Sequence, residues 1–549
     1  MKLRNVKHKI NIWSLLSTFF VLMIILPNAD IVIHLFNRTN ENWHHIKEYL
    51  LKDYVVNSII ITFFTAILSG VIGVTLAWLI SAYEFPGRNF FKWALILPLA
   101  IPPYIAAYTY NGILNYTGIV QKIFRNQLGI QLNPKYLDIM SIKGSIFIFT
   151  IFLFPYVYMI TKAFLEKQSA ALIENARLLG RNSIEIFFRV IMPISRAAIT
   201  AGVTLVILEV LNDYGVVSYF GVQTFSTAIF KTWFSMGDVD SAVRLSSILM
   251  MVVLAIILIE KLLRGRKKFS YTTTKISPLV RQELKGYKKV LAFSVSFIFL
   301  ALGFIIPTLQ LISWSILTYK KVLKASFLSL IFNSLWTSLI AAAIVIFISL
   351  IIANYTRLNN NVVSKVYSKI TLIGYSIPAA VISIAVILFF VDIDHRLSWL
   401  YKLIDPALPA LVLSTSIFML LFAYIIRFLS LGYQSVESGF DKVGSKFTEA
   451  SRTLGHSVTK TFLKVDYPMI KPAVISGFAL VFVDIIKELP LTLTLRPFNF
   501  NTLATRTFEY ANDEMIHEAS ISSLIIVLVS FICIYMIYKA EDKENKNIK

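Results

Sequence analysis

The chain has 549 residues, of which 56% are hydrophobic, 14% aromatic and only 15% charged. Soluble domains are about 45–50% apolar and about 25% charged, so this composition indicates an integral membrane protein and excludes disordered, disulfide-rich and secreted soluble classes. The single cysteine, Cys533, excludes an intramolecular disulfide and a cysteine-based zinc or iron-sulfur site.

Twelve apolar stretches are long enough to cross a bilayer, whose hydrocarbon core needs about 20 residues per helix. The first six are centred near Ile24, Ser69, Ile101, Leu153, Ile207 and Leu254. The other six are centred near Phe304, Ala343, Ala380, Phe418, Val481 and Ile526. The first stretch follows four basic residues but lacks a cleavage site, so we expect an uncleaved anchor in an all-α membrane fold.

The basic residues predict the orientation of these spans. If both termini are cytoplasmic, 36 of the 53 Lys and Arg residues fall in the predicted internal segments. This bias follows the positive-inside rule and accounts for the net charge of +22, with membrane lipid as the surrounding partner. A nucleic-acid partner is not expected, because it would require a basic soluble domain with aromatic stacking positions. The basic stretch 264–289 is predicted to be a cytoplasmic linker.

The two halves of the chain repeat one another. A shift of 275 residues gives 11 identities in 33 ungapped positions, where chance gives about two. Earlier in each half a shift of 276 pairs Asn57-Ser58 with Asn333-Ser334, and Pro102 with Pro378. Because six spans return the chain to the same side, we expect two parallel six-helix repeats, at 1–263 and 290–549. The paired prolines, with Pro103, predict kinked spans that serve either a pathway or packing.

Each repeat carries a similar cytoplasmic segment, at 167–193 in the first copy and 442–468 in the second. In both, a charged amphipathic helix precedes a glycine, a second helix and a proline. The glycine allows a turn or the close approach of a partner, and the proline fits the first turn of a helix. Two helices lying on lipid headgroups are the alternative, which two copies with matching spacing disfavour. The residues in question are Glu174, Ala176, Gly180 and Pro193, and Glu449, Ala450, Gly455 and Pro468.

This pattern resembles the loop by which permease subunits of binding-protein-dependent ABC importers dock onto their ATPase subunits. Departures are small, with Asn175 and Ser451 in place of alanines and valine in place of the later isoleucine. The resemblance covers nearly the whole chain and implies a duplicated, MetI-like permease fold of the type I importers. It further implies that the eight residues above form coupling loops, that two copies of a cytoplasmic ATP-binding subunit dock there, and that an external substrate-binding protein delivers the substrate.

The resemblance also implies a transport subunit in the bacterial inner membrane that binds no cofactor, because ATP is used by the partner. In agreement, no phosphate-binding loop of the form G-x4-G-K-[ST] occurs in the chain. A twelve-helix secondary transporter also has two parallel halves, but it needs no paired docking helices. A membrane-embedded enzyme would need a nucleophile paired with a base, and no such pairing is recognisable.

Two longer stretches, 214–234 and 487–506, are similar to the fused permeases of ferric-iron importers, and segments 77–87 and 97–102 agree. Related permeases serve thiamine and phosphonate importers, so these substrates stay open as alternatives.

Four carboxylates lie within the predicted spans. Glu209 and Asp213 on the fifth span match Asp484 and Glu488 on the eleventh, and a spacing of four predicts that each pair shares a helix face. Ionisable residues in spans usually face a cavity, and Fe³⁺ favours oxygen ligands, so a relay for the cation along a translocation pathway is one interpretation. The other is that these acids pair with Lys487, Arg244 or helix ends and hold the halves together. No metal site is assigned.

Overall fold

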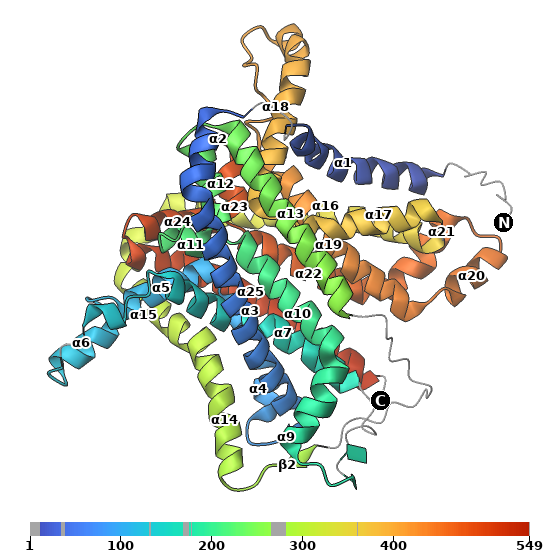
Figure 1. Cartoon of the computed structure of the whole chain (residues 1–549). Helices are drawn as coiled ribbons and strands as arrows, with labels where there is room; N and C mark the ends of the chain where they lie inside the picture. The colour runs from blue at the N-terminus through green and yellow to red at the C-terminus, as the bar shows by residue number, and fades with distance from the viewer. Residues whose placement is uncertain are drawn as a thin grey trace. The chain divides into compact units, whose positions relative to one another are not determined.

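The computed structural model describes residues 11–34, 39–130, 133–167, 175–176, 178–264, 281–359 and 361–547. Within these residues, ten helices are long and apolar enough to cross a membrane, or up to twelve if each of two bent pairs is one span. The predicted all-α membrane fold is therefore confirmed (Figure 1). Most of the predicted linker 264–289 lies outside the described residues. Of its described part, Gln282–Glu283 form β2, which pairs in parallel with β1 (Tyr83–Glu84), and the last three residues begin the next helix.

The first copy of the repeat contains sixteen described helical elements. They are α1 (Ile12–His34), α2 (Glu41–His45), η1 (Ile46–Leu50), α3 (Leu51–Ala82), α4 (Arg88–Ala94), η2 (Leu97–Ala100), α5 (Pro103–Leu114), α6 (Ile119–Asn126), η3 (Pro134–Tyr136), α7 (Ile142–Lys167), α9 (Ser183–Ile186), η4 (Phe187–Ile191), α10 (Met192–Asn212), α11 (Gly215–Tyr219), α12 (Phe225–Phe234) and α13 (Val239–Arg264).

The second copy follows the same order. Its described elements are α14 (Tyr287–Leu300), η5 (Ala301–Ile305), α15 (Ile306–Val322), α16 (Ala325–Leu358), α17 (Val362–Ile373), η6 (Gly374–Ser376), α18 (Ala379–Ile404), α19 (Ile417–Val443), α20 (Lys446–Thr453), α21 (Val458–Thr461), η7 (Phe462–Asp466), α22 (Tyr467–Ile486), α23 (Pro490–Leu495), α24 (Leu503–Asn512) and α25 (Ile516–Asn547).

The duplication is visible element by element. The helices α7, α9, η4, α10 and α11 begin 275 residues before α19, α21, η7, α22 and α23, and α5 begins 276 residues before α18. Even the π-helical turns η4 and η7 recur at matching positions. The two predicted offsets are therefore confirmed by the structure of the described residues.

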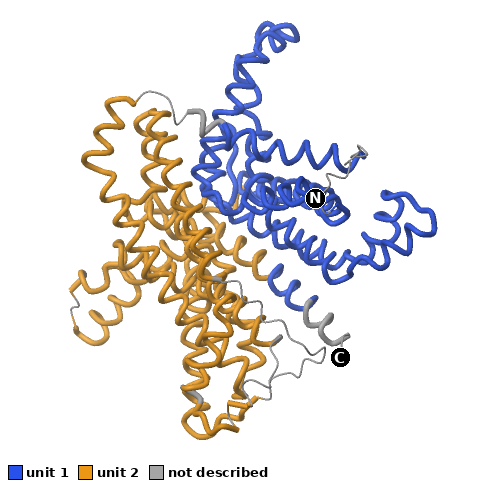
Figure 2. Tube along the Cα trace, turned by 45° about the vertical axis from the view of Figure 1, so that its right-hand side comes forward, with its two compact units in different colours: residues 1–38, 325–505, 532–549 blue, residues 39–324, 506–531 orange. Residues whose placement is uncertain are grey.

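The compact units of the structure do not follow the two halves of the sequence (Figure 2). One unit contains residues 1–38, 325–505 and 532–549, and the other contains 39–324 and 506–531. In the first unit α1 packs against α16, α17 and α18, and in the second η5 and α15 pack against η2 and α5. The first long helix of each copy thus packs with helices of the other copy, although the boundaries at 263 and 290 describe the duplication in sequence.

Glycines allow neighbouring long helices to pack closely within each unit. A Cβ at Gly202 on α10 would lie 2.8 Å from the Cα of Val157 on α7. At the matching position on α22, a Cβ at Gly477 would lie 2.7 Å from the Cβ of Ser435 on α19. Protein interiors leave no room for such overlap, so these glycines set the distance between the helices.

Two predicted spans are broken at the paired prolines. The helices on either side of Pro102 meet at 90°, and those on either side of Pro378 meet at 111°. Proline lacks the backbone N–H that would continue the helix and disfavours helical backbone in the preceding residue, which explains both breaks.

The span predicted with its centre near Phe418 is misplaced. Phe418 lies in the first turn of α19, which continues to Val443. A span of about 20 residues centred near Phe418 would end close to Arg427, where an arginine in the bilayer would be costly. In the structure Arg427 is buried and paired with an acid of the same unit, so the helix continues past it.

Candidate functional site

The second predicted coupling loop forms a helix, a turn and a second helix. α20 carries Glu449 and Ala450 on its exposed side, while Thr448 and Ser451 are buried. The chain then turns at Gly455 and enters the continuous helix formed by α21, η7 and α22. Ser451 and Thr461 share a hydrogen bond of 3.0 Å between their hydroxyl oxygens, which joins the two arms of the loop. α20 therefore has one buried face and one exposed face, which points away from its own bundle.

The first coupling loop is described only in part. Glu174 lies outside the described residues, whereas Ala176 is buried and Gly180 is exposed. Ala176 occupies the position of the buried Ser451 at the repeat offset, so both face inward. Of the predicted docking residues in this copy, Ala176 therefore packs against the permease itself.

Gly180 and Gly455 close their helices with the same turn. Their φ angles are +75° and +86°, in the left-handed region that glycine enters at little cost. Beyond them, the N–H of Arg181 donates to the carbonyl of Ala176 at 3.1 Å, and the N–H of His456 donates to that of Ser451 at 3.3 Å. These six-residue bonds define a Schellman cap in each copy. The predicted glycine turn is confirmed in both loops.

Exposed leucines flank both turns, and prediction from sequence did not single them out. Leu179 is 80% exposed and its repeat partner Leu454 is 79% exposed. Leu178 before Gly180 is also exposed, as is Phe447 on α20. Large apolar side chains gathered at a solvent-facing turn are typical of a protein interaction site. Their only signal in the sequence was that Leu179 and Leu454 are identical at the repeat offset.

Pro193 and Pro468 lie in the first turn of α10 and α22, in agreement with the prediction. Each follows a π-helical turn, η4 or η7, after one intervening residue. The continuous helical stretch that contains it begins ten residues before the proline, at Ser183 or Val458. A proline inside an α-helix would clash with the carbonyl four residues back. The wider π turn makes room for the ring, so the loop and the span form one continuous rod.

Asp213 and Glu488 lie beyond the ends of α10 and α22, so they do not share a helix face with Glu209 and Asp484 as predicted. The carboxylate of Asp213 accepts a hydrogen bond from the N–H of Val216 at 2.8 Å. Glu488 accepts one from the N–H of Leu491 at 3.1 Å. In both copies, therefore, the acid caps the short helix, α11 or α23, that follows the break.

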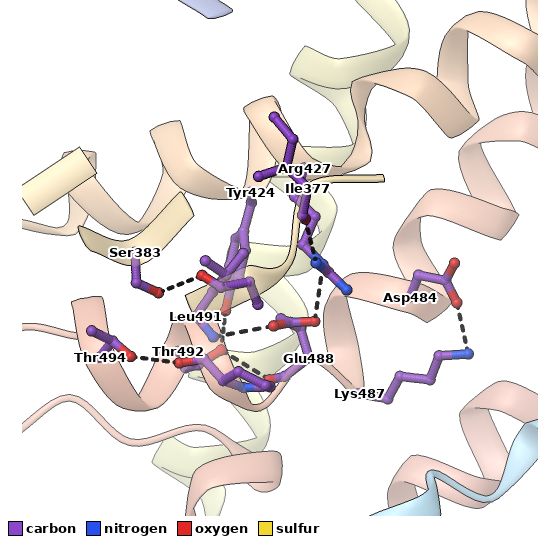
Figure 3. A network of polar contacts seen from close by, with 12 residues as sticks. Ile377, Ser383, Tyr424, Arg427, Asp484, Lys487, Glu488, Leu491, Thr492 and Thr494 are labelled. Atoms are coloured by element: carbon purple, nitrogen blue, oxygen red, sulfur yellow. Dashed lines mark hydrogen bonds and ion pairs between the residues drawn. The ribbon is translucent and has the colours of Figure 1, made fainter. Parts of the chain in front are cut away.

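Two basic residues accompany the acids of the second copy (Figure 3). Lys487 Nζ lies 2.6 Å from an oxygen of Asp484, and Arg427 Nε lies 3.5 Å from Oε2 of Glu488. The guanidinium of Arg427 also donates to the carbonyl of Ile377 at 3.4 Å. At the repeat offset the first copy has Phe152 and Asn212 in place of Arg427 and Lys487. These contacts agree with the part of the alternative interpretation in which the acids pair with Lys487 and with helix ends, but all of them lie within the second copy and none joins the two halves.

The repeated Asn-Ser pair, on α3 in the first copy and on α16 in the second, also has a structural use. Asn57 donates to the carbonyl of Gln223 at 2.9 Å, and Asn333 donates to that of Asn501 at 3.2 Å. The neighbouring serines, Ser58 and Ser334, accept the N–H groups that open α12 and α24. The pair therefore fastens the same short helix to the same long helix in each copy. Among the described residues no cluster of three metal-binding side chains is found.

Comparison with known proteins agrees with this duplicated arrangement. Residues 69–260 and 345–546 each match the family described as the inner membrane component of binding-protein-dependent transport systems. These two matches cover most of the chain, which therefore belongs to this family and is a multi-pass permease of the inner membrane. The duplicated MetI-like fold predicted from the sequence is thereby confirmed.

Several relatives have a stated substrate. The chain is 25% identical to an Fe(3+)-transport system permease protein of Haemophilus influenzae, over 85% of this chain and 86% of that protein. It is 24% identical to the ferric transport system permease protein of Actinobacillus pleuropneumoniae, over 86% of this chain and 70% of that protein. A sulfate transport system permease protein of Escherichia coli is 26% identical, over 37% of this chain and 70% of that protein.

Proposed function

We propose that the chain is the permease of an ATP-driven importer for ferric iron, which an external binding protein delivers. Two ATP-binding subunits dock below, one at each loop that contains Gly180 or Gly455. The observation that carries this proposal is the repeated Schellman turn with its exposed leucine, because a paired ATPase requires two equivalent docking surfaces. Both termini lie in the cytoplasm in this arrangement.

Ferric iron is favoured over other substrates because the ferric transport permeases match a larger share of this chain. The ferric transport permeases match across both copies, whereas the sulfate permease matches about a third of the chain. Segments 115–142, 220–243 and 495–517 each contribute external residues that contact the binding protein in this proposal. On α6, within the first of these, Ile119 and Ile123 are exposed and available for such a contact.

The substrate proposal predicts which receptor activates the complex. When the permease and its ATP-binding subunit are purified together in lipid, a receptor loaded with Fe³⁺ is expected to raise ATP hydrolysis about tenfold over the empty receptor. A tenfold change corresponds to about 1.4 kcal/mol of differential interaction. The control is the same receptor family loaded with sulfate, thiamine or a phosphonate. Activation by one of these ligands, and not by Fe³⁺, would show that this ligand is the substrate and that ferric iron is not.

The proposed relay for the cation can be tested at the two carboxylates that lie within the spanning helices. Glu209 lies in the last turn of α10 and Asp484 in the last turn of α22, at matching repeat positions. If they pass Fe³⁺ along the pathway, the double variant Glu209→Gln with Asp484→Asn should lower uptake about tenfold, because each change removes an anionic oxygen ligand. ATP hydrolysis should stay intact. Uptake equal to that of the wild type would remove the relay and leave the acids a structural role.

A further inference from the structure

A buried carboxylate lies behind the second docking loop. Asp466 is the last residue of η7, and it is only 2% exposed although its side chain is a carboxylate. Its Oδ1 accepts a hydrogen bond of 2.5 Å from the hydroxyl of Thr448 on α20. Its Oδ2 lies 2.9 Å from Nη2 of Arg357, in the last turn of α16. The carboxylate therefore connects the docking helix to a long helix of the same unit.

Arg357 extends this connection to a third helix. Its guanidinium lies 4.1 Å from the ring centroid of Phe440, near the end of α19, in a cation–π contact. Removing Arg357 would leave the carboxylate of Asp466 buried without its charge partner, which is strongly unfavourable. Arg357, Thr448 and Asp466, which we call the Asp466 cluster, therefore hold α20 in one position relative to α16 and α19.

The N-terminal helix contacts the same loop from another side. Trp13 on α1 donates its Nε1–H to the hydroxyl of Thr459 at 3.2 Å. Its ring meets that of Phe462 edge-on, with centroids 4.9 Å apart. α1 thus contacts the second arm of the loop at one end and packs along α16, α17 and α18.

The first copy lacks the residues that form the Asp466 cluster and the contacts of Trp13. At the repeat offsets Arg357, Thr448 and Asp466 correspond to Ser81, Ile173 and Ile191, so no ions occur at these three positions. Phe187 occupies the position of Phe462 in the first copy. Its ring centroid lies 6.4 Å from that of Trp78, which is on α3 of the same copy. The position of Trp78 in the second copy is Asn354, and Trp13 of α1 supplies the aromatic ring instead.

We propose that Asp466 and Trp13 are positioning residues for the transmission of force from the second docking loop. Movement of α20 passes to α16 through the Asp466–Arg357 pair and to α1 through Trp13. The described part of the first loop transmits its movement through apolar contacts such as that between Phe187 and Trp78. The two docking loops are therefore unequal, even when identical ATP-binding subunits occupy them. This inference rests on the proposed docking function of the loops.

The test replaces residues of the second copy with those at the matching positions of the first copy, so that a defect in force transmission can be distinguished from a defect in folding. The triple variant Arg357→Ser, Thr448→Ile and Asp466→Ile removes both ions together, so that no charge is left without its partner. A second variant, Trp13→Phe, keeps an aromatic ring and removes the hydrogen bond to Thr459, and Trp13→Ala removes both. Trp78→Ala on α3 removes the corresponding aromatic contact of the first copy and allows the two loops to be compared. Each full-length variant is purified with its ATP-binding subunit and reconstituted in liposomes with Fe³⁺-loaded receptor.

Three readouts are compared: retention of the ATP-binding subunit, ATP hydrolysis, and iron taken up per ATP. The triple variant and Trp13→Ala are expected to keep the subunit and hydrolysis but to lower uptake per ATP at least about fivefold, the lower end of typical coupling between sites. Trp13→Phe should lie in between. Wild-type uptake per ATP in the folded triple variant would overturn the inference alone. Failure of the wild-type permease to retain the subunit would refute the proposed function, and this inference with it.

Discussion

Uptake is expected to be lost when Gly180 and Gly455 are both replaced by valine. The two glycines have φ angles of +75° and +86°. A residue with a Cβ in left-handed backbone costs roughly 1–2 kcal/mol, and a β-branched residue is a clear outlier there. The turns should therefore rearrange and displace Leu179 and Leu454. We expect the ATP-binding subunit to be lost on purification, while the permease still inserts into the membrane in normal amounts.

An asparagine pair at the same positions is the matched control. Asparagine tolerates left-handed backbone, and a Cβ at either glycine meets nothing within 4 Å in the chain itself. The asparagine variant should therefore keep the turn and retain part of the uptake. The single valine variants show whether one intact loop suffices. A valine pair that retains the ATP-binding subunit and transports at the wild-type rate would show that the docking assignment is wrong.

Loss of Arg427 should destabilise the permease more than loss of any exposed arginine. The side chains of Arg427 and Glu488 are 4% and 7% exposed, and they lie at the break that ends α22 (Figure 3). Arg427→Met removes the cation and leaves the carboxylate buried, which typically costs about 3–5 kcal/mol. The expected result is a much lower midpoint of thermal unfolding in detergent, measured on the purified permease.

The double variant Arg427→Met with Glu488→Gln is the control for this prediction. Because both ions are gone, it should recover most of the stability that the single variant loses. The side-chain amide of glutamine can still accept the N–H of Leu491, so the cap on α23 is kept. Equal unfolding midpoints for the single variant and the wild type would show that the pair adds no stability.

Much of the fold followed from the sequence because membrane spans and repeats leave strong local patterns. Lengths of apolar sequence predicted the helices, and the offsets of 275 and 276 residues predicted where each element recurs. The exchange of α1 and α15 between the copies was not predicted, because neither apolar length nor the repeat records which helices are neighbours. The helix that contains Arg427 was also placed wrongly, because a charged residue indicates the end of a span unless its charge partner is known.

The candidate site was predictable where its chemistry is local. Gly180 and Gly455 were found because they are identical at the repeat offset and glycine allows the chain to turn. Asp466 was not found, because it contacts Arg357, which lies over 100 residues away and has no counterpart in the other copy. Asp213 and Glu488 were found but misplaced, since helical spacing was assumed to continue past Asn212 and Ile486.

The packing of α1 has a consequence for how the protein is made. His34 ends α1, and the first of its packing partners, α16, begins at Ala325. At synthesis rates of roughly 5–20 residues per second, about 15–60 s pass before α16 starts to emerge. During that interval α1 waits in the bilayer among lipids or transient protein contacts. α1 therefore reaches its final neighbours only after the helices between it and α16 have been synthesised.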